Sequence, residues 1–233
     1  MTSPVIPMPQ KVEERTPAQV VLQPVAAPSI LGLYGFAGAT FIVAANMAHW
    51  FGTSQTALYL APFAAMFGGL AQFLAGMWSF KARDGVASAM HGMWGSFWLA
   101  YGLLSILFAT GTLAKPTGAF EALGFWFIVL AAITWVGCFA AAAEVKALAW
   151  VLGFLAAGST IAAMGQIVGM EPLNVLAGYL FIISAVIAWY VASALMLESV
   201  YGRPVWPLGK TARAAEHPKV MIGAGEPGVI RGQ

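Results

Sequence analysis

The chain has 233 residues, of which 60% are hydrophobic and only 9% are charged, and its formal net charge is +2. A soluble domain carries roughly a quarter charged residues, so this composition excludes an ordinary soluble globular protein. The small net charge gives no indication of nucleic-acid binding, and a single cysteine, Cys138, excludes an intrachain disulfide.

The first thirty residues predict a disordered cytoplasmic N-terminal tail. They contain six prolines and no continuous apolar run of about 7–15 residues, so they do not form a secretory signal. A second segment rich in proline and glycine ends the chain, and we expect a cytoplasmic C-terminal tail over residues 201–233. Between the two tails we expect one transmembrane domain over residues 31–200.

Six apolar runs of about twenty residues each fill this central region. Twenty residues at about 1.5 Å per residue match the thickness of the hydrocarbon core of a bilayer. The predicted spans cover residues 31–51, 59–80, 87–110, 119–143, 147–169 and 173–197. The fold class is therefore an all-α membrane protein with six transmembrane helices and with both termini on one side.

The distribution of lysine and arginine predicts which side that is. Ten of the eleven Lys and Arg residues fall in the tails or in the loops on the side of the tails, and Lys115 lies on the opposite side. Basic residues accumulate in cytoplasmic loops, so we expect cytoplasmic termini in the cell membrane. Trp50 and Trp78 fall at predicted span ends, where amphipathic rings favour the lipid headgroups.

Glycines recur at helical spacing in the first three predicted spans. Small residues at this spacing let helix backbones approach closely in lipid. The glycines concerned are Gly32, Gly35, Gly38, Gly68, Gly69, Gly76, Gly92 and Gly95. We interpret most of them as positions of tight helix packing.

No acidic or basic residue lies well inside any predicted span. This argues against a voltage sensor, a buried carboxylate relay or a catalytic pair of acids, so we expect no enzyme. The neutral polar side chains could bind a small polar solute, and they could equally hydrogen-bond neighbouring helices. His49 and His91 fall in opposite leaflets, which argues against a haem held by both, and we expect no metal and no cofactor.

Four sequence strings resemble one known family. They are APSILGLYGFAGAT (27–40), FGGLAQFLAGMW (67–78), WGSFWL (94–99) and YGRPVWPLG (201–209). In this order, and with six spans, they resemble the acetate uptake transporter family, also called succinate–acetate permeases. The resemblance covers about residues 28–209.

The resemblance implies a homohexamer in the lipid membrane, in which each six-helix protomer has its own narrow path. In the family this path carries acetate and related small carboxylates such as succinate, in many members with proton coupling. Matching the strings implies a constriction that includes Phe36 and Trp94. Aligning the fifth span with the family by its ending, Gly165, Gln166 and Ile167, implies that Leu155 completes it, and a small residue near Ala188 shapes the path from the sixth span. Counted from the cytoplasmic span ends, these four residues lie within about 6 Å of one another in depth, so they could form a ring. They could also be ordinary core residues.

We therefore predict a transporter or channel for short monocarboxylates, with acetate first. Neutral donors such as Gln72, Ser96 and Gln166 would meet the carboxylate. A coupled proton would travel on the substrate, on water or on His91, although a role of His91 in helix packing or at the interface is slightly favoured.

Departures from the family strings keep two alternatives open. Ala27 and Ile30 stand where the family has Asn and Pro, Ser79 replaces an acidic residue, and Trp94 replaces a Tyr. One alternative is a membrane subunit or sensor that does not transport. The other is a channel for a different small polar solute, such as urea, ammonia or a short amide.

Overall fold

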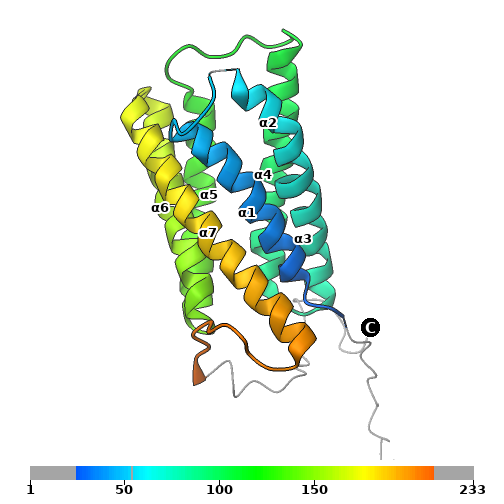
Figure 1. Ribbon diagram of the computed structural model, residues 1–233. Coiled ribbons are helices and arrows are strands. Elements are labelled where there is room, and N and C mark those ends of the chain that lie inside the picture. Colours follow the sequence, from blue (N-terminus) through cyan, green and yellow to red (C-terminus); the bar gives the residue numbers. More distant parts are fainter. Residues whose placement is uncertain (1–24, 54, 213–233) are drawn as a thin grey trace, which may run out of the picture.

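The computed structural model describes residues 25–53 and 55–212, and the protein is an all-helical, multi-pass membrane protein (Figure 1). The prediction of six spans is confirmed, because six helices in the described part of the chain are long and apolar enough to cross a bilayer. Their elements are α1 (Pro28–Met47), α2 (Thr56–Ala64), η1 (Ala65–Ala71), α3 (Gln72–Lys81), α4 (Gly85–Ala109), α5 (Glu121–Ala142), α6 (Lys146–Val168) and α7 (Glu171–Tyr201).

The first and the last span end at other residues than predicted. The first was expected to reach residue 51, but α1 ends at Met47, because the chain turns through a left-handed His49 with φ of 60°. The last was expected to end at residue 197, but α7 continues to Tyr201, where Gly202 caps it with φ of 66°. At 31 residues α7 is about 46 Å long, and in Figure 1 it crosses the bundle obliquely.

The second span is a composite of α2, η1 and α3. Pro62 lies inside α2 and has no backbone N–H to donate, and the π-helical segment η1 follows three residues later. A π-helical segment holds more residues per turn than an α-helix, so it rotates α3 relative to α2. The direction in which the side chain of Gln72, the first residue of α3, points therefore depends on η1.

The helices form two groups joined by α1. On one side α6 packs against α5 and α7, on the other α4 packs against α3 and η1, and α1 contacts both α7 and α3 (Figure 1). Contacts between α4 and α5 are sparse. The middle of the bundle is consequently filled by side chains that α1, α4 and α6 point toward one another.

Glycine packing brings α3 against α4. A Cβ built on Gly76 would lie 2.6 Å from the backbone nitrogen of Gly92, which no real side chain tolerates. The close helix approach predicted from the glycine pattern is thus confirmed at this pair.

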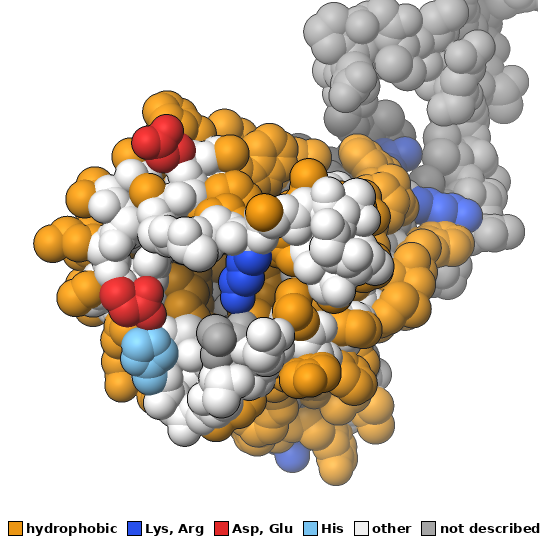
Figure 2. Space-filling view, turned by 90° about the horizontal axis from the view of Figure 1, so that it is seen from above, with side chains coloured by type: hydrophobic (Ala, Val, Ile, Leu, Met, Phe, Trp, Pro, Cys, Tyr) orange, Lys and Arg blue, Asp and Glu red, His pale blue; other side chains and the backbone are white. Residues whose placement is uncertain are grey.

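The outer surface of the bundle is apolar. Val136 and Phe139 on α5 are 68% and 70% exposed, and Phe63 on α2 is 60% exposed. Seen along the bundle from its upper end, hydrophobic side chains occupy the rim, and polar and backbone atoms occupy much of the middle (Figure 2). Lipid covers a surface of this kind in a membrane protein.

The segment that follows α7 packs against the turn between α5 and α6. The Lys146 N–H donates to the Gly209 carbonyl at 3.1 Å, and the Thr211 N–H donates to the Glu144 carbonyl at 2.8 Å. Leu208 is buried between these contacts. The expected C-terminal tail is therefore packed as far as Thr211.

The rest of both expected tails falls on residues 1–24 and 213–233, which lie outside the described residues. Helix α1 begins at Pro28, three residues before the predicted start of the transmembrane domain at residue 31. Proline is favoured in the first turn of a helix, where its missing N–H costs nothing.

Candidate functional site

Two cavities lie inside the bundle, one toward each membrane surface. The terminal-side cavity, at the end where α1 begins and α7 ends, has a volume of about 170 Å³. The loop-side cavity, at the opposite end, has a volume of about 240 Å³. Most side chains that line them are apolar. The terminal-side lining includes Leu33, Phe36, Met90, Leu152 and Leu208, and the loop-side lining includes Val43, Met47, Tyr101, Phe127 and Phe181.

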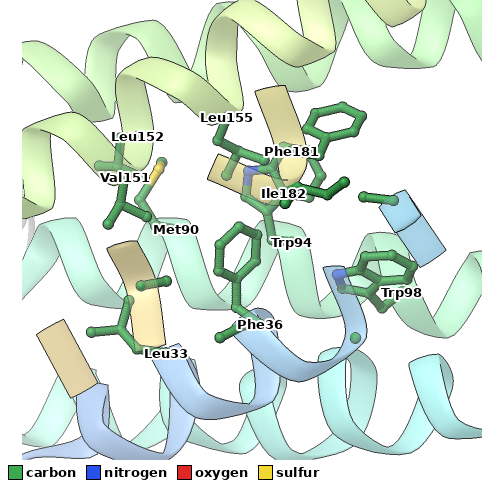
Figure 3. Close-up of a cluster of buried hydrophobic side chains, with 14 of the residues drawn as sticks. Leu33, Phe36, Met90, Trp94, Trp98, Val151, Leu152, Leu155, Phe181 and Ile182 are labelled. Atoms are coloured by element: carbon green, nitrogen blue, oxygen red, sulfur yellow. The ribbon is translucent and has the colours of Figure 1, made fainter. Parts of the chain in front are cut away.

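The two cavities share a wall. Trp94 on α4 and Leu155 on α6 line both of them, so these two side chains lie between the two spaces. Phe36 on α1 lines the terminal-side cavity and meets the Trp94 ring edge-to-face, with the centroids 6.4 Å apart. Figure 3 shows Phe36 and Leu155 on either side of Trp94. The three residues expected to form a constriction are thus neighbours between two cavities.

Most buried hydroxyl groups in the helices bond to their own backbone. Ser79, Ser105 and Ser159 each donate to the carbonyl four residues earlier, at 2.8 Å. This pattern satisfies a hydroxyl inside a membrane helix without any partner from elsewhere. A buried polar atom that lacks a partner is therefore unusual in this molecule and marks a position of interest.

Two of the unpartnered atoms belong to side chains that line the terminal-side cavity. They are Gln72 Oε1 and His91 Nδ1, and neither side chain is more than 5% exposed. Gly32 gives the His91 ring its space, since a Cβ at Gly32 would lie 2.5 Å from His91 Cε1. Both side chains come from α3 and α4, whose close packing fixes their positions. They can hydrogen-bond to a small polar solute in this cavity.

Two others belong to side chains that line the loop-side cavity. Thr40 Oγ1 and Trp98 Nε1 are buried without a partner among the described residues, and both side chains belong to the cavity wall. A hydroxyl and an indole N–H can both donate to an oxygen of a solute. All four unpartnered polar atoms of the described residues thus fall on side chains that line one cavity or the other.

Of the other three expected path residues, one lines a cavity and two do not. Gln166 lines the loop-side cavity, where its amide nitrogen donates to Asn174 Oδ1 at 3.2 Å. Ser96 and Ala188 are not among the residues that line either cavity. The Ser96 hydroxyl donates to the Gly92 carbonyl at 2.8 Å, and Ala188 is completely buried in the apolar core. Their predicted contact with a solute is not visible in the arrangement of the described residues.

Charged side chains lie at the membrane-surface ends of the bundle. Asp84, Glu144 and Lys210 line the terminal-side cavity, where Asp84 also caps α4 by accepting the Ala87 N–H at 2.8 Å. At the opposite end His49 pairs with Glu171 at 2.8 Å. Between these ends the shared wall is apolar, so a solute would exchange a polar environment for an apolar one midway. Among the described residues no cluster of His, Cys, Asp or Glu could hold a metal ion.

Three polar side chains near the path were missed in the sequence. Thr40, Trp98 and Thr134 are buried on or next to the cavity walls. A single hydroxyl residue in the middle of a highly apolar span could have indicated the two threonines, and this pattern is clearest for Thr134 in α5. Nothing in the sequence pattern distinguished Trp98, because tryptophan is a common packing residue in membrane helices.

Comparisons with known proteins agree on one family. The family model described as the GPR1/FUN34/yaaH family matches residues 12–208. The succinate-acetate/proton symporter SatP of Escherichia coli K12 is 26% identical over 186 residues, which cover 80% of this chain and 96% of that protein. The meiotically up-regulated gene 86 protein of Schizosaccharomyces pombe is 37% identical over 82 residues, which cover 34% of this chain and 26% of that protein.

A solved structure of the bacterial acetate channel SatP has the same fold. The TM-score is 0.71 at 25% identity, and the match covers 80% of this chain and all of that chain. The names of the relatives matched over nearly their full length describe a symporter and a channel, and not an enzyme.

Proposed function

This chain belongs to the GPR1/FUN34/yaaH family, and from that membership we propose that it carries acetate and related short carboxylates, succinate included, across the membrane. One feature of the structure supports the proposal independently of the similarity to known transporters. Two cavities with unpartnered polar side chains are separated by the apolar side chains of Phe36, Trp94 and Leu155.

The proposed path runs through each protomer from one cavity to the other. Thr40 and Trp98 receive the carboxyl group in the loop-side cavity, and Gln72 and His91 receive it in the terminal-side cavity. The constriction between them has no polar lining and excludes water, as apolar constrictions in channels do. Homohexamer assembly, with one path in each protomer, is part of this proposal.

We further propose that the carboxylate crosses the constriction with a proton. An anion in an apolar passage loses its hydration without compensation, whereas the neutral acid loses far less. The name of the E. coli relative, a proton symporter, supports this coupling. Gln72 Oε1 can accept the acid's O–H, and His91 can pass on a proton through its unpartnered ring nitrogen.

We propose that both termini face the cytoplasm of the cell. The described basic residues support this orientation. At the end of the bundle that holds the terminal-side cavity, Lys81 ends α3 and Arg83 follows it, Lys146 begins α6, and Arg203 and Lys210 follow α7. Lys115 lies in the loop between α4 and α5, at the other end.

The test is uptake of labelled acetate into proteoliposomes that contain the purified protein. We expect uptake above that of empty liposomes, and a faster rate when the outside is acidic. Uptake equal to that of empty liposomes for acetate, propionate and succinate would refute carboxylate transport. Swelling in isotonic urea under the same conditions would favour a channel for another polar solute.

A further inference from the structure

The Trp94 indole is tied to a helix that otherwise touches α4 little. Its Nε1–H donates to Thr134 Oγ1 on α5 at 3.0 Å, and both side chains are buried. Met90 against Gly137 and the ring of Phe97 against that of Phe127 are the neighbouring contacts between the two helices, and both are apolar. Of these three contacts between α4 and α5, the hydrogen bond from Trp94 to Thr134 is the polar one.

The direction of this hydrogen bond is fixed by the chemistry of its partners. The Thr134 hydroxyl donates its only proton to the Leu130 carbonyl at 2.6 Å. Its oxygen therefore faces Trp94 as an acceptor, and an indole N–H can only donate. The two bonds form a chain from Trp94 through Thr134 to the backbone of α5.

The Trp94 indole belongs to the wall between the two cavities. Trp94 lines both of them, and its ring is held edge-to-face by Phe36 at 6.4 Å and Phe97 at 5.4 Å. Aromatic contacts of this kind orient a ring but allow it to slide. A ring that turns away must release Thr134, and a buried N–H without a partner is costly. Water or a carboxyl oxygen in a cavity can then serve as the new acceptor.

We propose that Thr134 is a positioning residue that holds the Trp94 indole between the two cavities, and that a carboxylate passes only when this hydrogen bond is released. The inference rests on the proposed function for its transport part. According to this inference, α5 controls the constriction, although it contributes little to the cavity walls.

The experiment uses Thr134→Val, which keeps the shape of the side chain and removes the acceptor. The protein is labelled with 5-fluorotryptophan, and the fluorine resonance of Trp94 is identified by its loss in Trp94→Phe. We expect Thr134→Val to shift and broaden the Trp94 resonance. We also expect the maximal rate of acetate uptake to rise about fivefold, the factor that one ordinary hydrogen bond contributes, with a smaller change in KM.

Two further variants serve as controls. Thr134→Ser keeps the acceptor, and we expect it to retain both the wild-type resonance and the wild-type rate. Thr160→Val removes a similar bond at the lipid-facing surface, where Trp135 Nε1 donates to Thr160 Oγ1 at 3.3 Å. We expect this variant to shift the Trp135 resonance and to leave that of Trp94, and uptake, unchanged. If Thr134→Val does not fold, Thr134→Ala makes the same test.

Two results would overturn the inference. A Trp94 resonance unchanged in Thr134→Val would show that the hydroxyl does not hold the ring, and a shifted resonance with an unchanged maximal rate would show that the bond does not control passage. If the wild-type protein takes up no carboxylate, the proposed function fails, and control of passage fails with it. The fluorine spectra would still decide whether Thr134 holds the indole.

Discussion

Gln72→Leu is expected to make the protein more stable and less active at the same time. Gln72 Oε1 is buried, unpartnered and part of the terminal-side cavity wall. Leucine has a similar volume and fits the apolar side chains around it, such as Leu33 and Phe36. The substitution removes an unsatisfied acceptor from the folded state, together with the group that we propose receives the substrate.

The magnitude follows from the burial of this amide, which is 2% exposed. A buried acceptor without a partner costs about 1–3 kcal/mol, so the gain in stability is about 2 kcal/mol. For a chain of this length each kcal/mol raises Tm by about 2–4 °C, so the shift is about 4–8 °C. The loss of one hydrogen bond to the substrate slows acetate uptake by about fivefold.

The assay combines thermal unfolding in detergent with acetate uptake into proteoliposomes. Ser79→Ala is the matched control, because Ser79 lies two turns further along α3, is fully buried and already donates to the Ala75 carbonyl. We expect this control to show no rise in Tm and wild-type uptake. A Gln72→Leu protein with a lower Tm and unchanged uptake would refute the reasoning, since the amide would then be a structural residue with no role in transport.

Three further predictions concern the constriction, the C-terminal segment and the topology. Trp94→Ala joins cavities of about 170 and 240 Å³, so we expect butyrate uptake relative to acetate to rise about tenfold, and an unchanged ratio would exclude Trp94 from the constriction. Leu208→Ala weakens the packing of the segment after α7 by about 2–3 kcal/mol, so trypsin should cleave after Lys210 faster than in the wild type, and equal cleavage rates would contradict this. In a Cys138→Ala background, a cysteine at Thr112 should react with an impermeant maleimide in intact cells and one at Ala82 only after lysis, and the reverse pattern would invert the orientation.

Much of the fold was readable from hydropathy. The six spans follow from run length alone, because a bilayer demands about twenty apolar residues for each crossing. The ends of α1 and α7 were misjudged, because a left-handed His49 and a capping Gly202 are local backbone events that hydropathy does not register. The packed segment around Leu208 was missed for a related reason, since its prolines and glycines resemble those of a loose tail.

The sequence led to only some of the residues that line the cavities. The resemblance to the family led to Phe36, Trp94 and Leu155, and in the structure Trp94 and Leu155 line both cavities while Phe36 packs against Trp94. The same approach named Ala188, which is completely buried and is not among the residues that line either cavity. A count of residues from the span end gives the depth of a side chain but not the side of the helix from which it points.

The sequence by itself determined that this chain lies in a membrane, how many times it crosses, and which family it resembles, because these properties depend on composition and on short strings. Tertiary structure decided which polar atoms are satisfied and which are not. The Thr134 hydroxyl bonds to Leu130 and Trp94, whereas the Thr40 hydroxyl has no partner among the described residues and belongs to a side chain that lines a cavity. The two threonines look alike in the sequence, and only the helices packed around each of them determine whether it holds a neighbour or is available to a solute.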